Sequence, residues 1–130
     1  MSAFDHTGKL IAVTGGTRGI GEAIVRRLCS EGAIVFATYN AQVERAANIT
    51  AEIEAKGGKV TYQKVDVGNE VQAKAFIESV VQQGGRIDGL VNNAGATRDG
   101  LIMRMSLADW ESVLNTNLTG AFLTCRAACR

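Results

Sequence analysis

The chain contains no proline, and only one histidine, one tryptophan and two tyrosines occur among its 130 residues. It also lacks an excess of charge, because 14 Lys and Arg against 13 Asp and Glu leave a formal net charge of +1. This balance gives no electrostatic reason to expect nucleic acid or an anionic membrane surface as a partner. No apolar run approaches the length of a membrane span, and residues 1–9 have no apolar signal core. We therefore expect no membrane and a cytoplasmic location.

Cysteine is scarce as well. Cys29, Cys125 and Cys129 make an odd number in a chain without a secretion signal, which argues against a disulfide framework. Cys125 and Cys129 share one helix face, but the only histidine, His6, lies near the start of the chain. We therefore expect cysteines that pack in the core and no metal site.

Glycine, by contrast, is abundant, and three glycines fall within Thr14–Gly21. This segment follows the apolar run Leu10–Val13 and precedes the amphipathic stretch Ile20–Leu28, an order that predicts strand, glycine turn and helix. The first turn of a helix has unpaired backbone N–H groups and the positive end of the helix dipole. Glycines let the backbone come close to a ligand there. The segment therefore predicts a phosphate-binding turn.

Strand and helix signals alternate along the rest of the chain. The expected strands are 9–13, 34–38, 59–65 and 90–93, and the expected helices are 18–31, 41–56, 70–83 and 107–130, the last loosened near 119–120. Units of this length predict an α/β fold, a doubly wound parallel sheet with right-handed crossovers, in a single domain. Ligands in such sheets bind at the carboxyl ends of the strands, where the glycine turn, Thr38, Asp66 and Asn93 fall.

Residue spacing also predicts how the helices begin and which face they bury. Candidate caps are Asn40, Asn69 and Ser106. The expected inner faces are Ile20, Ala23, Ile24 and Leu28 in the first helix, and Val71, Ala75, Phe76 and Val80 in the third.

Four motifs in this order resemble those of the short-chain dehydrogenase/reductase family. They are the T-G-x-x-x-G-x-G turn at 14–21, Asp66 after the third strand, N-N-A-G at 92–95, and Asn117 in the last helix. The resemblance implies a Rossmann-like sheet with strand order 3-2-1-4. It implies that Asn117 is catalytic and holds a water in a proton relay. It also places a nicotinamide cofactor against Gly15, Thr17, Arg18, Gly19, Ile20, Gly21, Thr38, Asn40, Asp66, Val67, Asn93, Ala94 and Gly95.

Residues 93–105 resemble more narrowly the 3-oxoacyl-[acyl-carrier-protein] reductases of fatty-acid synthesis, and related acetoacetyl-CoA reductases share parts of this stretch. The resemblance implies NADPH-dependent reduction of a β-keto thioester, carried by acyl-carrier protein or CoA, to a β-hydroxy thioester. It also implies a homo-oligomer for the full-length family. Met103, Arg104 and Met105 are as consistent with packing as with contact to an acyl chain.

The choice of cofactor follows from the end of the second strand. An NAD enzyme usually places an acid there to bind the ribose 2′-OH, but this chain has Thr38, Tyr39 and Asn40. Thr38 and Asn40 can donate to a 2′-phosphate, and Arg18 adds a cation, so we expect NADP(H). Simpler roles remain open: Arg18 as a solvated surface residue, Asp66 as a turn cap, and Asn93 as a turn residue.

The family's serine and its Y-x-x-x-K pair are missing. Neither Tyr39 nor Tyr62 has a lysine four residues on, since Val43 and Asp66 stand there. We therefore expect residues 1–130 to be a truncated fold, the N-terminal cofactor-binding part of one Rossmann domain, without ketoreductase activity alone. An open fourth strand and a bare apolar face on the last helix predict aggregation, poor folding or rescue by a second chain. The alternatives are an NADP-binding module without chemistry and a non-functional truncated product.

Overall fold

The computed structural model describes residues 4–130, so the first three of the residues examined for a signal core lie outside the described part. Four strands form one parallel sheet in the order β3-β2-β1-β4, as the resemblance implied. They are β1 (Leu10–Val13), β2 (Ile34–Tyr39), β3 (Lys59–Lys64) and β4 (Gly89–Val91). All four residues of β1 are buried because the strand is central and covered on both faces, which explains its uninterrupted apolar sequence.

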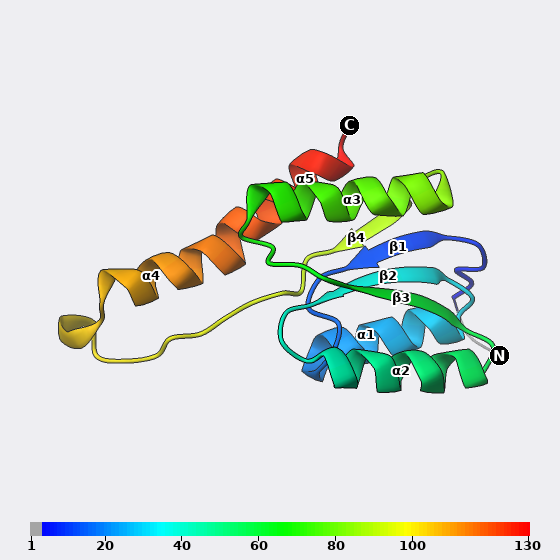
Figure 1. The fold of residues 1–130 in the computed structure, drawn as a ribbon, viewed down its shortest axis with the longest axis horizontal. Coiled ribbons are helices and arrows are strands. Elements are labelled where there is room, and N and C mark those ends of the chain that lie inside the picture. Colours follow the sequence, from blue (N-terminus) through cyan, green and yellow to red (C-terminus); the bar gives the residue numbers. More distant parts are fainter. Residues whose placement is uncertain (1–3) are drawn as a thin grey trace.

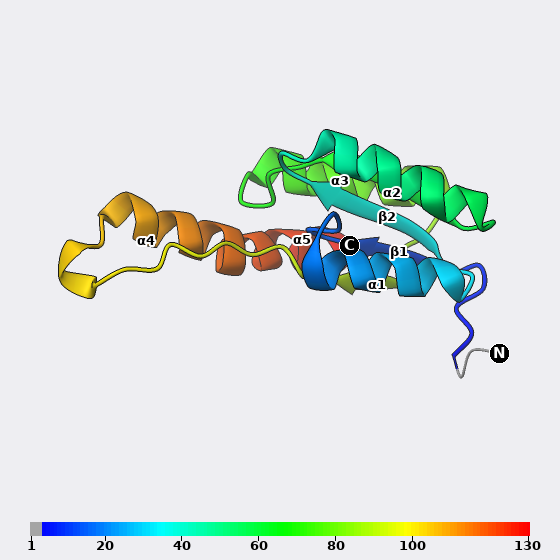
Figure 2. The same cartoon turned by 90° about the horizontal axis from the view of Figure 1, so that it is seen from below.

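Helices cover both faces of this sheet. Helices α1 (Gly19–Ser30) and α2 (Val43–Ala55) lie on one face, and α3 (Glu70–Gly84) and α5 (Gly120–Ala128) lie on the other (Figure 1). The remaining elements are the 3₁₀ turn η1 (Ile102–Arg104), α4 (Leu107–Leu114) and the π-helical turn η2 (Asn115–Thr119). Helix α4 extends beyond the ends of the strands (Figure 2). Within residues 4–130 no helix has the length and apolarity needed to cross a bilayer.

The core has two parts, one on each face of the sheet. Val13, Val25 and Ile49 belong to the cluster under α1 and α2, while Phe36 and Phe76 belong to the cluster under α3. Cys29 packs in the first cluster as expected, whereas Cys125 and Cys129 are exposed. The sheet and its covering helices therefore form a three-layer α/β unit.

The predicted inner faces of α1 and α3 are partly wrong. In α1 the fully buried residues are Gly21, Val25 and Cys29; Ile24 and Leu28 are half-buried, Ala23 is exposed, and Ile20 is 74 % exposed. In α3 they are Ala73, Phe76, Ile77 and Val80, while Val71 and Ala75 are exposed. In both helices the first apolar residue, Ile20 in α1 and Val71 in α3, lies in the opening turn and is exposed.

Two of the three predicted caps are confirmed. The Asn69 side chain accepts from the Gln72 amide, and the Ser106 hydroxyl oxygen accepts from the Asp109 amide. The Asn40 cap is wrong, because α2 begins at Val43 after an N-cap at Gln42 that makes no side-chain cap bond. The chain uses residues 40–42 to turn from the end of β2 back over the sheet.

The predicted loosening of the last helix is confirmed by η2, which separates α4 from α5. Gly120 follows this turn and is buried, and a Cβ there would lie 2.9 Å from Val67 Cγ2. A glycine is therefore needed where α5 approaches the segment after β3.

An exposed apolar stripe runs along the outer side of α4, η2 and α5. Its members recur every fourth residue: Trp110, Leu114, Leu118 and Phe122. This is the bare face that the sequence predicted for the last helix. Strand β4 pairs only with β1 among the described residues, so its other edge is open.

Candidate cofactor site

The predicted site residues gather at the carboxyl ends of the strands. The turn after β1 lies beside the ends of β2 and β4, and its first residue, Thr14, is buried. The Thr14 hydroxyl oxygen accepts hydrogen bonds from the backbone amides of Asn93 and Ala94, at 3.1 and 3.0 Å. The Asn93 side-chain amide in turn donates to the Gly15 carbonyl at 2.9 Å. Asn93 therefore does more than turn the chain, since it joins the N-N-A-G motif to the glycine turn.

Two glycines of the turn have a steric reason to be glycine. Gly15 has a φ of +69°, and a Cβ there would lie 2.9 Å from Ala94 Cα. A Cβ on Gly21 would lie 2.0 Å from the Gly15 oxygen and 2.4 Å from Asn93 Nδ2. The first turn of α1 is therefore packed directly on the loop that precedes it.

The start of α1 is open to a ligand. Its N-cap is Arg18, which has an extended backbone and makes no side-chain cap bond. The backbone N–H groups of Gly19, Ile20 and Gly21 donate to no residue within 4–130. A Cβ on Gly19, whose φ is +54°, would meet nothing within 4 Å. Unpaired amides beside open space are what a pyrophosphate requires, so this turn fits a dinucleotide.

The end of β2 carries no carboxylate. Thr38 lies behind the turn and is buried; its hydroxyl oxygen accepts from the Gly15 amide at 3.0 Å, and its carbonyl accepts from the Gly16 amide at 2.9 Å. Asn40 and Arg18 are both exposed. Of the two polar residues expected to donate to a 2′-phosphate from this strand, only Asn40 is therefore accessible, while Thr38 shapes the turn.

Asp66 caps the turn after β3. One of its carboxylate oxygens accepts from the Gly68 amide at 3.0 Å, and the other accepts no hydrogen bond from residues 4–130. The next residue, Val67, is buried and contributes to the core. The exposed Asp66 carboxylate therefore has one oxygen committed to the turn and one available to a ligand.

Asn117 lies in η2 and binds the loop after β4. Its Oδ1 accepts from the Ala96 amide at 2.7 Å, and its Nδ2 donates to the Ala96 carbonyl at 3.0 Å. A Cβ on Gly95 would lie 3.3 Å from the same Oδ1. A hollow of about 370 Å³, lined in part by Trp110 and Met105, opens beside Asn117. Asn117 thus ties the π-helical turn to the end of the N-N-A-G motif.

Sequence reasoning missed several residues that hold these loops. The Tyr62 hydroxyl donates to the Gly16 carbonyl at 2.6 Å, and Arg45 Nε donates to the Thr17 carbonyl at 3.1 Å. Asn115 Nδ2 donates to the Gly68 carbonyl at 3.2 Å. No motif marks them, because each acts on a partner distant in the sequence. The position of Asn115 two residues before Asn117 was the one available signal.

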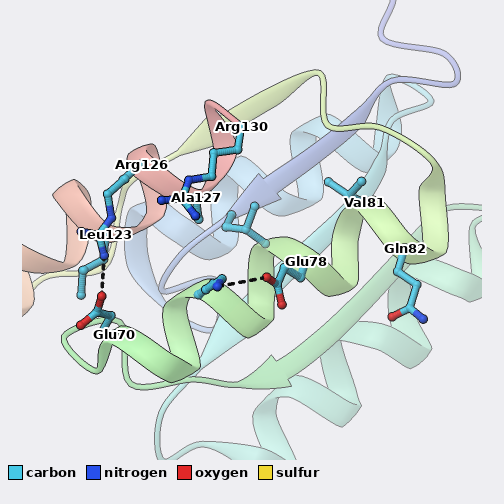
Figure 3. Close-up of a pocket in the computed structure, with 10 residues that line it drawn as sticks. Glu70, Glu78, Val81, Gln82, Leu123, Arg126, Ala127 and Arg130 are labelled. Atoms are coloured by element: carbon cyan, nitrogen blue, oxygen red, sulfur yellow. Dashed lines mark hydrogen bonds and ion pairs between the residues drawn. The ribbon is translucent and has the colours of Figure 1, made fainter.

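A larger hollow, of about 560 Å³, lies between α3 and α5 (Figure 3). The charged side chains along it are partly paired with one another: Arg126 contacts Glu70 at 2.7 Å, and Lys74 contacts Glu78 at 3.7 Å. None of the predicted site residues lines it. It is therefore separate from the site at the strand ends.

A family model described as short chain dehydrogenase matches residues 9–130. The chain belongs to the short-chain dehydrogenase family. Among curated relatives, the 3-oxoacyl-[acyl-carrier-protein] reductase FabG of Chlamydia pneumoniae is 42 % identical over 123 residues, 95 % of this chain and 49 % of the relative. The enzyme of the same name from Staphylococcus aureus is 44 % identical over 114 residues, 88 % of this chain and 46 % of the relative. This short-chain dehydrogenase chain spans about half the length of the curated relatives it matches.

Solved structures of the family share this fold. A short-chain dehydrogenase/reductase from Serratia marcescens superposes with a TM-score of 0.94 at 37 % identity, covering 98 % of this chain and 52 % of that one. A short-chain dehydrogenase from Burkholderia cenocepacia, solved in complex with NADP, gives 0.92 at 39 % identity over 95 % and 51 %. These likenesses agree with the sheet order and place the chain among short-chain dehydrogenases.

Proposed function

We propose that residues 1–130 are the N-terminal, cofactor-binding part of a Rossmann-fold reductase that uses NADPH to reduce 3-oxoacyl thioesters to 3-hydroxyacyl thioesters. The cofactor assignment rests on one observation: the open amides at the start of α1 directly follow an exposed Arg18, while the end of β2 is followed by an exposed Asn40 and carries no acid. The substrate assignment rests on the relatives at 42–44 % identity, which are named as 3-oxoacyl reductases.

Each part of the site has a role in this proposal. The amides of Gly19, Ile20 and Gly21 bind the pyrophosphate, since they are unpaired within residues 4–130 and the space around Gly19 is open. Thr17 and Gly15 shape the turn that precedes them. Arg18 and Asn40 bind the 2′-phosphate, and Thr38 supports the turn from behind.

The other end of the cofactor falls to the loops after β3 and β4. The free oxygen of Asp66 accepts from the adenine amino group, with Val67 beside it. Asn93, Ala94 and Gly95 form the wall towards the nicotinamide. Asn117, fixed by Ala96, holds a water for proton transfer. When bound, the cofactor supplies the hydride.

The substrate, assembly and location follow from the same relatives. We infer a 3-oxoacyl group carried by acyl-carrier protein or CoA, as in fatty-acid synthesis, and a cytoplasmic enzyme. The stripe Trp110–Phe122 gives an apolar face of the kind that a homo-oligomer covers.

The cofactor preference can be tested at Asn40. Isothermal titration should show the chain binding NADPH more tightly than NADH. An Asn40→Asp substitution should lower the affinity for NADPH about 10-fold, which corresponds to roughly 1.4 kcal/mol, because a carboxylate repels a 2′-phosphate. The affinity for NADH should stay the same or rise. Asn48→Asp, the same change on an exposed position of α2, should alter neither affinity. If the unsubstituted chain bound NADH more tightly than NADPH, the assignment of NADPH as the cofactor would be wrong.

Turnover needs a proton donor that these residues do not contain. General acid catalysis contributes about 10²- to 10⁴-fold, and no tyrosine in the sequence has a lysine four residues on. The purified chain with acetoacetyl-CoA should oxidise NADPH no faster than a control without protein. A full-length 3-oxoacyl reductase in the same assay shows that the substrate is competent. Oxidation clearly above the control contradicts this prediction.

A further inference from the structure

Three consecutive carbonyl groups of the glycine turn each accept a hydrogen bond from a different element. The Gly15 oxygen accepts from Asn93, the Gly16 oxygen from Tyr62 on β3, and the Thr17 oxygen from Arg45 on α2. We name these three side chains the carbonyl clamp. No other side-chain donor among residues 4–130 contacts these oxygens.

The clamp fixes the direction of the peptide groups in the turn. A carbonyl oxygen carries a partial negative charge, so a carbonyl turned towards a phosphate repels it, whereas an amide N–H attracts it. The amides of Gly15 and Gly16 are also fixed, since both donate to Thr38. The amides of Thr17 and Arg18, which share their peptides with the Gly16 and Thr17 oxygens, donate to no residue within 4–130, as is true of Gly19, Ile20 and Gly21. The clamp therefore holds the negative end of each of these peptides away from the phosphate position.

Tyr62 reaches the turn from two strands away. It is half-buried, and a Cβ on Gly16 would lie 3.3 Å from its ring atom Cε1. Its hydroxyl lies 2.6 Å from the Gly16 oxygen. Burial, followed by the nearby Cys29 and Glu22, raises the pKa of Tyr62 above its ordinary value, so the hydroxyl keeps its proton. The side chain is thus a permanent donor, and Gly16 lacks a side chain where the ring lies.

Arg45 holds the last carbonyl of the clamp and also joins two helices. Its Nε donates to the Thr17 oxygen, and its guanidinium pairs with Glu22 on α1. Glu22 pairs as well with Arg26, which contacts no atom of the turn. The guanidinium is planar and its Nε and terminal nitrogen point in fixed directions, so one side chain can satisfy both partners at once.

We propose that Tyr62 and Arg45 are positioning residues for dinucleotide binding, acting through the peptides of Gly16 and Thr17 on the pyrophosphate. This inference rests on the proposed function, since it assumes that the turn binds a pyrophosphate. It adds two residues that no motif marks. It also offers a reason for glycine at position 16, because the Tyr62 ring lies where a side chain would begin.

The test compares two ligands that share the 2′-phosphate and the adenosine. NADPH has a pyrophosphate, whereas adenosine 2′-phosphate has none. In isothermal titration, Tyr62→Phe and Arg45→Met should each lower the affinity for NADPH about 3- to 10-fold, which is the effect expected from the loss of one hydrogen bond. Adenosine 2′-phosphate should bind each variant as it binds the unsubstituted chain. Equal weakening of both ligands would show a general structural or charge effect and overturn the proposal.

Two control variants match these changes. Ser79→Ala removes a hydroxyl that bonds to Gln63 and Phe76, and Arg26→Met removes the other ion pair of Glu22. Neither side chain contacts the turn, so both controls should bind NADPH unchanged. Weakening by Arg26→Met equal to that by Arg45→Met would overturn the role of Arg45.

A measurement without cofactor separates this inference from the proposed function. In amide hydrogen exchange, the Gly15 and Gly16 amides should exchange about 3- to 10-fold faster in Tyr62→Phe and not in Ser79→Ala. If NADPH binds the unsubstituted chain but the clamp variants change neither affinity nor exchange, the inference is wrong and the proposed function stands. If exchange rises as expected but no variant, nor the unsubstituted chain, binds NADPH, the proposed function is wrong and the positioning role falls with it.

Discussion

Gly21→Ala should abolish measurable NADPH binding and lower the free energy of unfolding by about 3 kcal/mol or more. A new Cβ would lie 2.0 Å from the Gly15 oxygen and 2.4 Å from Asn93 Nδ2. The first contact is with backbone that β1 and the carbonyl clamp hold, so neither side can move away without opening the turn. In an unconstrained helix the same change is stabilising by about 1 kcal/mol, which makes the expected sign diagnostic. Urea unfolding and isothermal titration measure both effects.

Two other glycines provide matched controls for this substitution. Gly19 has a φ of +54° but open space around a Cβ, so Gly19→Ala should cost about 1–2 kcal/mol through backbone strain alone. Gly100 has neither a positive φ nor a neighbour within 4 Å, so Gly100→Ala should be nearly neutral. A Gly21→Ala chain that unfolds and binds NADPH like Gly100→Ala would refute the packing argument.

The centre of the sheet was predictable because β1 and β2 carry continuous apolar runs. Buried parallel strands need such runs. The face of α1 was not predictable from apolar spacing alone, since that spacing gives no weight to glycine. Gly21 is the contact that orients the helix, and the buried line 21-25-29 follows from it. Ile20 then falls on the exposed side, one residue before this line.

The site divides in the same way. The motif residues lie where their order along the chain indicated, because the ends of parallel strands meet at one edge of a sheet. Tyr62 could not be found this way, since its contact depends on the register between β2 and β3, which places Tyr62 opposite Ala37. The accessibility of Thr38 was misjudged for a related reason: its hydroxyl oxygen is used by Gly15, a partner on another strand end. Sequence order locates the loops, while cross-strand register decides which side chains face a ligand.

Thr14 offers the clearest test that strand ends and cofactor site are one structure. Thr14→Val keeps the shape of the side chain but removes the oxygen that accepts from the Asn93 and Ala94 amides. The Asn93 amide still has the Val91 carbonyl at 3.1 Å, whereas the Ala94 amide has no other acceptor within residues 4–130. An amide left without a partner in this way costs about 1–3 kcal/mol. We therefore expect a loss of about 2–3 kcal/mol in the free energy of unfolding, measured by urea titration.

The same substitution should weaken NADPH binding, because the N-N-A-G loop loses its attachment to the glycine turn. Thr14→Ser is the matched control: it keeps the acceptor oxygen and loses only a buried methyl group, so it should cost about 1 kcal/mol and leave NADPH affinity nearly unchanged. If the buried contact were only packing, Val would be the better tolerated of the two, because it keeps both branches of the side chain. The order Ser above Val in stability and affinity therefore identifies the hydroxyl oxygen as the link between β1 and the loop after β4. The reverse order would assign that link to the remaining contact, from Asn93 Nδ2 to the Gly15 oxygen.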